Sequence, residues 1–259
     1  MVDRTSGGNA RMIAVDNPIP CRACPLQDCA GLRPLEPRQL DYMQGFKQGE
    51  VRVERLETVV RQGETRRRLY TVLEGVLMRY RELDDGRRQI VNFMFAGDLI
   101  GLQGAFEEPS SHSVAALLPA RLCLFEQSEF SALIGRHPGL GYDLTWLAAK
   151  EETALEEHMV AVGRRSAKER ITYLAVWLLD RALGVGMADA DNRLALPLNQ
   201  TQIADMLGLS LVHTNRKIKA LAREGLVEWN PGEISVPDLD AASDYARYDR
   251  KSGQRRPFI

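Results

Sequence analysis

Short apolar runs that alternate with polar residues fill much of the first half of the chain. Four of them stand out: 69–73, 76–80, 89–93 and 121–125. A period of two places every second side chain on one face of a strand, so these runs predict antiparallel strands between about Gly45 and Phe130. Asp85-Gly86 lies between two of the runs and favours a tight hairpin, because such a turn needs positive φ.

A longer apolar spacing begins after His137-Pro138. From Gly139 to about Val162 no proline intervenes, and the apolar residues are three, four or several whole turns apart, which predicts one long helix. Its narrow apolar seam favours packing on the same helix of a second copy; the alternative is a helix that packs flat on the β domain. Glu151 and Glu152 interrupt the seam, and like charges facing each other there would weaken the dimer. The predicted dimer interface is Leu144, Leu147, Glu151, Leu155, Met159 and Val162.

A helix-turn-helix is predicted from 199 to about 223. Asn199 can cap a short first helix through its side chain, and Gln202, three residues later, completes a capping-box pattern. Gly208 then allows a left-handed turn, and Ser210 caps the second helix.

The second helix of this motif has two unlike faces. Its inner face, with spacings of four and three, consists of Thr214, Ile218 and Leu221. Its outer face consists of Val212, Asn215, Arg216 and Lys219. This polarity is typical of a recognition helix that packs on its partner helix and enters the major groove of DNA.

The outer face carries the groups that read bases. Arg216 can bind O6 and N7 of guanine bidentately, and Asn215 can pair with adenine, whereas His213, Lys217 and Lys219 are better placed for phosphates. A solvated basic helix in another helical domain is the alternative, but the cap, the Gly turn and the two faces together favour DNA. The predicted DNA-contacting residues are Ser210, Val212, His213, Asn215, Arg216, Lys217 and Lys219.

Two short apolar runs follow the helix-turn-helix, at 226–229 and 233–236, with Asn230-Pro-Gly232 between them. They predict a β-hairpin, the wing of a winged helix. The fold class expected from the whole pattern is α+β: an antiparallel β domain, a long helix and a winged helix-turn-helix.

Composition is that of a globular protein of two domains, with 259 residues and 44% hydrophobic content. No stretch approaches the roughly 18 uninterrupted apolar residues of a membrane span, and the first ten residues lack a hydrophobic export core. A cytoplasmic protein without a membrane partner is therefore expected.

The charge is sorted along the chain. A formal net charge of -1 would argue against a nucleic-acid partner, but 211–223 carries four basic residues and no acid. An enzyme is not favoured, because no Gly-rich loop could cradle a phosphate and the histidines show no motif spacing with a nucleophile. They are His112, His137, His158 and His213.

The cysteines are unevenly placed. Cys21, Cys24 and Cys29 crowd into nine residues, while Cys123 stands alone far along the chain. In a reducing compartment they are not expected to form structural disulfides.

The order of parts resembles the CRP/FNR superfamily of bacterial transcription regulators, over roughly residues 18–237. The most specific motifs are 69–75 (LYTVLEG), 84–86 (DDG), 95–101 (FAGDLIG) and 199–221. The resemblance implies a β-roll sensor domain of the cyclic-nucleotide-binding type, a jelly roll. It also implies a homodimer formed through the long helix, binding to a palindromic operator in double-stranded DNA, and recruitment of RNA polymerase.

The resemblance also divides the chain. The expected parts are a cysteine-bearing N-terminal extension at 1–30, a β-roll at 31–136, a dimerisation helix at 137–165, a winged helix-turn-helix at 166–240 and a polar tail at 241–259. Residues 1 to about 17 are expected to be a disordered lead.

Cyclic AMP is disfavoured as the β-roll ligand. Relatives that bind it carry a glutamate for the ribose and an arginine-serine pair for the phosphate, and those places hold Leu102 and His112-Ser113 here. A leucine accepts no hydrogen bond, and a mostly neutral imidazole replaces a bidentate guanidinium poorly.

Three cysteines before the β-roll and one within it resemble the FNR branch, in which four thiolates hold an oxygen-labile 4Fe-4S cluster. Soft thiolates stabilise such clusters, and Cys123 would tie the N-terminal segment to the sensor domain. The resemblance implies Cys21, Cys24, Cys29 and Cys123 as ligands and transcription control by oxygen or redox state. A four-thiolate zinc site and no metal at all are the alternatives, and the third cysteine follows one residue earlier than in the best-known members. Without a cluster, the regulator would respond to another small ligand or be constitutively active.

The recognition helix departs from the FNR pattern at two places. Val212 stands where those proteins have a glutamate, and Asn215 where a serine is usual, whereas Arg216 fits the family's arginine. Val212 offers only an apolar contact, for example to a thymine methyl, so a different half-site is expected.

Overall fold

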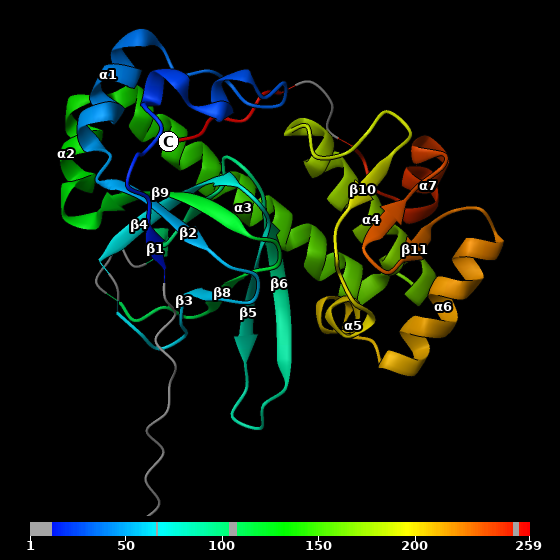
Figure 1. The fold of residues 1–259 in the computed structure, drawn as a ribbon. Helices are drawn as coiled ribbons and strands as arrows, with labels where there is room; N and C mark the ends of the chain where they lie inside the picture. Colours follow the sequence, from blue (N-terminus) through cyan, green and yellow to red (C-terminus); the bar gives the residue numbers. More distant parts are fainter. Residues whose placement is uncertain (1–11, 66, 104–107, 251–253) are drawn as a thin grey trace, which may run out of the picture.

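The computed structural model describes the chain except for residues 1–11, 66, 104–107 and 251–253 (Figure 1). Most of the predicted disordered lead lies outside the described residues. Its end is ordered, because β1 (Ile13–Ala14) pairs with the next strand in antiparallel fashion.

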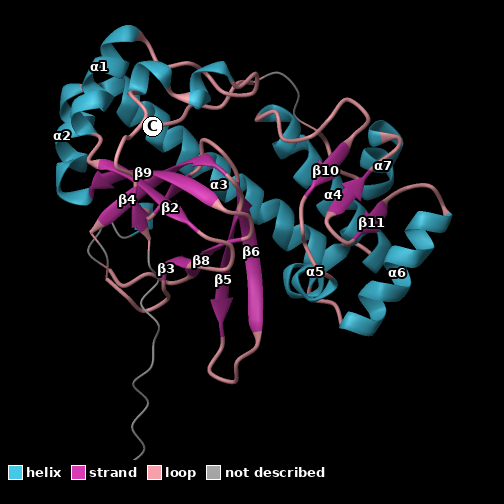
Figure 2. Cartoon of the chain, viewed as in Figure 1, coloured by secondary structure: helices cyan, strands magenta, loops and turns pink. Residues whose placement is uncertain are grey.

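Two antiparallel sheets pack face to face in the N-terminal domain, as Figure 2 shows. The first has the order β1, β2 (Gly49–Val53), β9 (Ala120–Glu126), β4 (Arg68–Glu74), β7 (Leu99–Ile100). The second has the order β3 (Thr58–Val60), β8 (Ser113–Ala116), β5 (Leu77–Glu82), β6 (Arg88–Met94). The predicted strands are confirmed, and Gly86 adopts φ 82° in the expected β5–β6 turn.

Helices that the apolar spacing did not predict cover one end of this β-roll (Figure 1). They are η1 (Cys21–Ala23), η2 (Pro25–Asp28), α1 (Pro37–Phe46), η4 (Gln127–Glu129) and α2 (Phe130–Arg136). A usable signal existed for α1. Glu36 and Gln39 form a reciprocal capping box around Pro37 at the first helical position, where its missing N–H costs nothing.

The long helix α3 (Pro138–Arg164) runs from the β-roll to the C-terminal domain (Figure 1). Its apolar seam is divided between partners. Leu144 and Leu147 are buried in the core of the chain's own sensor domain, so they do not form the predicted dimer interface. Glu151 forms an ion pair with Arg79 of the same chain, and Val162 packs beside Gly208. Leu155 and Met159 remain exposed. The helix thus packs on the β domain along its first half.

The C-terminal domain is built on α4 (Ala167–Gly184), which begins with a capping box of Ser166 and Glu169. The helices α5 (Gln200–Leu207) and α6 (Leu211–Arg223) follow. A small sheet with the order β10 (Arg193–Ala195), β12 (Glu233–Ser235), β11 (Glu228–Asn230) contains the predicted wing. The predicted α+β fold is therefore confirmed.

The expected polar tail is wrong. Residues Leu239–Ala246 form α7, which packs on α4, because its apolar face closes the core of the C-terminal domain. Further on, Phe258 and Ile259 are buried in the sensor domain. Among the described residues, none of the helices has the length and apolar character needed to cross a membrane.

Candidate functional sites

The two helices of the helix-turn-helix are fixed by local chemistry. The Asn199 side chain accepts the backbone N–H of Gln202 at 2.9 Å. In return, the Gln202 side chain accepts the backbone N–H of Asn199. Gly208 ends α5 with φ 62°, in the left-handed region that favours glycine. Ser210 then caps α6, because its hydroxyl accepts the N–H of His213 at 3.3 Å.

The outer face of α6 is open to solvent. Thr214, Ile218 and Leu221 are buried against the rest of the domain, as predicted. Val212 is 81% exposed, and Arg216 and Lys219 are exposed as well. No acidic residue lies within the helix, so its free face combines an apolar contact, a guanidinium and an ammonium group. Such a face suits the major groove.

Two of the predicted DNA-contacting residues have partners within the chain. Ser210 uses its hydroxyl as the cap, and Asn215 donates its amide N–H to Gln200 Oε1 at 2.8 Å. Asn215 must release Gln200 before it can pair with a base. Arg216 Nη2 lies 3.2 Å from His213 Nδ1, so His213 lies beside the guanidinium and can orient it.

A cavity of about 870 Å³ lies between the β-roll and α3. Its wall includes Leu102 and His112, the residues predicted to disfavour a cyclic nucleotide. Burial, together with Arg79 and Arg81, lowers the pKa of His112 to about 4, so the imidazole is neutral at physiological pH. A neutral imidazole agrees with the expectation that His112 offers no cationic group to a phosphate.

Arg79 and Arg256 are the cationic residues among the described residues that line the cavity. Arg79 is the one that belongs to the β-roll. This β5 residue is 9% exposed, and its Nη2 pairs with Glu151 of α3 at 2.5 Å. Its Nε is buried without a hydrogen-bond partner among the described residues. The sequence analysis did not identify Arg79, because an arginine in an alternating strand is expected to face solvent and its partner Glu151 comes from a distant helix.

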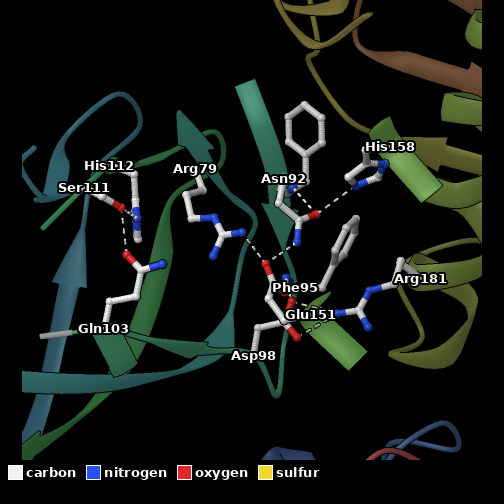
Figure 3. A network of polar contacts seen from close by, with 11 residues as sticks. Arg79, Asn92, Phe95, Asp98, Gln103, Ser111, His112, Glu151, His158 and Arg181 are labelled. Carbon is white, nitrogen blue, oxygen red and sulfur yellow. Dashed lines mark hydrogen bonds and ion pairs between the residues drawn. The ribbon is translucent and has the colours of Figure 1, made fainter. Parts of the chain in front are cut away.

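A chain of polar contacts leads from this cavity to the C-terminal domain. Figure 3 shows its part from Arg79 through Glu151 and Asn92 to His158. Asn92 of β6 donates to Glu151 Oε1 at 2.8 Å, and its Oδ1 lies 3.4 Å from His158 Nε2. His158 Nδ1 lies 2.7 Å from the hydroxyl of Tyr173 in α4. The cavity wall, α3 and α4 are thus joined by polar contacts between buried and half-buried side chains.

A second polar contact joins the domains at Asp98, which follows β6. Asp98 accepts the N–H of Phe95 at 2.8 Å and pairs with Arg181 of α4 at 2.7 Å and with Arg256 at 2.6 Å (Figure 3 shows the first two). Burial alone disfavours the carboxylate, but the two guanidinium groups outweigh it, so the pKa of Asp98 is lowered. One buried carboxylate therefore joins three distant segments.

The four predicted cysteine ligands belong to one apolar cluster at the capped end of the β-roll. Cys21 and Cys123 are buried there, and Cys24 and Cys29 pack against them. Cys123 lies near enough to Cys21 and Cys24 for their charges to interact, whereas the Cys29 thiol faces the carbonyl of Pro25 at 3.6 Å. Burial raises the pKa of Cys24 to about 11 and that of Cys123 to about 12.

This arrangement fits a thiolate-ligated group in donor type. β9 carries Cys123 to the N-terminal cysteines, and the ammonium group of Lys47, itself paired with Glu50, lies beside them and favours thiolates. Within the part of the chain that the structure describes, no three His, Cys, Asp or Glu side chains are close enough to hold a single metal ion.

Comparison with known proteins matches both domains. Residues 50–137 match the family model of the cyclic nucleotide-binding domain, and residues 173–241 match that of the Crp-like helix-turn-helix domain.

Relatives match nearly the whole chain. The nitrogen fixation regulation protein FixK of Bradyrhizobium diazoefficiens is 31% identical over 224 residues, which are 84% of this chain and 90% of that protein. The transcriptional activator protein FnrL of Cereibacter sphaeroides is 28% identical over 82% of each chain. The structure of FixK2 from Bradyrhizobium japonicum is similar with a TM-score of 0.67, at 26% identity, over 76% of this chain and 96% of that one.

Proposed function

Because this chain belongs to the CRP/FNR family of DNA-binding transcription regulators, we propose that it is an activator of the FNR/FixK type that oxygen controls through a 4Fe-4S cluster. The chain is a regulator and not an enzyme. The proposed cluster ligands are Cys21, Cys24, Cys29 and Cys123. The observation that carries the proposal is that these four thiols, three from the N-terminal segment and one from β9, belong to one apolar core.

The chemistry of the cysteine end supports this control. When bound, the cluster would supply an oxygen-labile link between the N-terminal segment and the sensor domain. Residues around the four cysteines suit such a group. The Lys47 ammonium offsets negative charge, and the burial of Cys21 and Cys123 limits access of water. The segment that bears three of the thiols also contacts the end of α4, since Gly31 N–H donates to Gly184 O at 2.8 Å. A change at the cysteines can therefore reach the DNA-binding domain.

A homodimer would carry two recognition helices to a palindromic operator and recruit RNA polymerase there. Leu155 and Met159 of α3 are exposed and lie one helical turn apart, which supports a contact between copies. Arg216 would read a guanine in each half-site, with Val212 against a neighbouring base.

An anaerobic metal assay tests the cluster. Protein purified without oxygen should contain about four iron and four acid-labile sulfide per chain and lose both in air, together with operator affinity. Cys24→Ser and Cys123→Ser should abolish the iron content. Ala23→Ser is the matched control for Cys24→Ser, because it places a hydroxyl on the exposed residue next to Cys24 and leaves every thiol. Iron-free anaerobic protein would overturn the proposal.

A second candidate is a regulator of the same fold that responds to a small anionic ligand in the β-roll cavity. The observation that favours it is the buried Nε of Arg79, which has no partner in the described residues and lines a cavity of about 870 Å³. Normal regulation by the cysteine variants with and without oxygen would favour this candidate. Loss of the response in Arg79→Ala, but not in the exposed neighbour Arg81→Ala, would then locate the ligand.

A further inference from the structure

Residues 254–259 lie against the sensor domain, although they follow the DNA-binding domain in the chain. Figure 1 shows the end of the chain beside α1 and the cysteine-bearing segment, far from α6. Pro257, Phe258 and Ile259 are buried, with Phe258 only 2% exposed. A tail of this composition would ordinarily be solvated, so its burial calls for a specific surface beneath it.

The tail pairs with the segment that follows the third cysteine. Leu32 and Arg256 form a parallel bridge, in which Arg33 N–H donates to Arg256 O at 2.7 Å and Arg256 N–H donates to Gly31 O at 2.9 Å. Leu32 N–H in turn donates to Cys29 O at 3.0 Å. The tail therefore binds as a short added strand, a recurrent mode of peptide recognition.

Shape and hydrogen bonding select the apolar end of the tail. Phe258 and Ile259 enter the same apolar cluster as Cys21 and Cys123. Gly97 leaves room at this point, because a Cβ there would lie 3.0 Å from Leu32 Cδ1 and 3.6 Å from Phe258 Cβ. The Thr71 hydroxyl donates to the Ile259 carbonyl oxygen.

Charge selects the other end of the tail. Arg256 pairs with Asp98 at 2.6 Å, and Asp98 is also held by Arg181 of α4. The preceding Arg255 is exposed, so the two adjacent arginines are in opposite environments. The surface thus contains an anionic position for Arg256, a backbone edge and an apolar recess in the order in which the tail presents its groups.

We propose that the surface formed by Gly31–Arg33, Thr71 and Gly97–Asp98 is a peptide-binding groove, and that its ligand is the chain's own Arg256–Ile259. Occupied, the groove gives the DNA-binding domain a further link to the sensor domain, in addition to the α3–α4 connection and the contacts of Asp98 with Arg181 and of Arg88 with Asp205. Because Leu32 of the groove donates its N–H to Cys29 O, movement of the cysteine-bearing segment changes the hold on the tail. The groove does not depend on what the cysteines bind.

Hydrogen exchange in the full chain tests the groove. The Arg33 amide reports directly, because its N–H donates to Arg256 O. In Phe258→Ala and in Arg256→Ala its exchange should accelerate about tenfold or more, while amides in the middle of α4 keep their protection. Arg255→Ala is the matched control and should leave the Arg33 amide unchanged. Unchanged protection of Arg33 in both groove variants would overturn the groove.

Rescue by a free peptide separates binding from general destabilisation. A synthetic peptide of residues 254–259, added to the Phe258→Ala chain, should restore protection at Arg33, and the same peptide with alanine at position 258 should not. Equal effects of the two peptides would contradict a specific groove. The link between domains is tested by operator binding: Phe258→Ala should change the Kd about threefold or more relative to Arg255→Ala, and an equal Kd would overturn the link.

Discussion

His158 is a buried side chain that connects the sensor domain to the first helix of the DNA-binding domain. A neutral imidazole with its proton on Nε2 satisfies both neighbours, since Nε2–H then faces Asn92 Oδ1 and Nδ1 accepts from Tyr173. Burial, with Arg79 and Arg165 nearby, lowers the pKa of His158 to about 3. Nothing in the sequence around His158 distinguishes it, because its partners come from β6 and α4.

The free energy of unfolding should therefore fall as pH falls below about 6.5. The unfolded chain binds a proton at His158 there and the folded chain does not, so acid favours the unfolded state by up to about 1.4 kcal/mol per pH unit. For His158 this loss of stability extends over the pH range from about 6.5 down to about 3. His112 contributes in the same direction from pH 6.5 down to about 4. Urea unfolding at pH 7, 6 and 5 measures it. His158→Gln should flatten the dependence, and an unchanged slope would contradict this account. His213→Gln in α6 is the control.

Arg216 is the side chain of the recognition helix best placed for base reading. Arg216→Ala should lower operator affinity by about 1–3 kcal/mol and relax the preference at one base position. Fluorescence anisotropy with operators substituted at each position measures both effects. Lys219→Ala should instead weaken all sequences alike, because a phosphate contact carries no sequence information. A uniform loss in Arg216→Ala would contradict base reading.

The helix-turn-helix and α3 show what a sequence pattern does and does not contain. Asn199, Gly208 and Ser210 act through contacts within a few residues, so the caps and the turn could be predicted. The spacing of Leu144 and Leu147 correctly indicates a helix, but periodicity gives no information about the partner of an apolar face. That partner is the β-roll, and only Leu155 and Met159 of the predicted seam remain free.

A homodimer through α3 should therefore depend on its exposed turn. Replacing Leu155 and Met159 together by lysine should raise the dimer dissociation constant about tenfold to a hundredfold, since desolvated apolar anchors dominate such contacts. Analytical ultracentrifugation measures the effect. Ile134→Lys on α2, a similarly exposed apolar residue, should leave the sedimentation unchanged. An unaltered double variant would show that copies do not meet at this turn.

At the scale of the whole molecule, contacts between distant segments hold the two domains together, and these were beyond prediction. The β5–β6 hairpin could be predicted from Asp85-Gly86, but not that Arg88 beside it pairs with Asp205 of α5 at 2.9 Å or that Gln89 donates to Met206 O. A polar tail was expected at 241–259, although several apolar residues occur there. Two of them, Phe258 and Ile259, hold the tail against the sensor domain, because they are buried in a core formed by residues far away in the sequence.

The Arg88–Asp205 pair should stabilise the domain arrangement measurably. A double-mutant cycle with Arg88→Ala and Asp205→Ala should give a coupling free energy of about 0.5–1.5 kcal/mol in urea unfolding, because both side chains are largely buried. The adjacent Arg87–Asp85 pair is the control. It lies at 2.8 Å in the same hairpin, but it is exposed and local, so its coupling should be near zero. Equal couplings for the two pairs would contradict a bracing role for the hairpin.

The burial of Phe258 and Ile259 also affects the order in which the protein can fold. A ribosome makes the β-roll first and residues 254–259 after every other described segment, yet these last residues complete the apolar cluster that contains Cys21 and Cys123. The sensor domain therefore remains incomplete while the DNA-binding domain is being synthesised. Phe258 and Ile259 can pack against Cys21 and Cys123 only after that interval, so the last residues made complete the core of the domain made first.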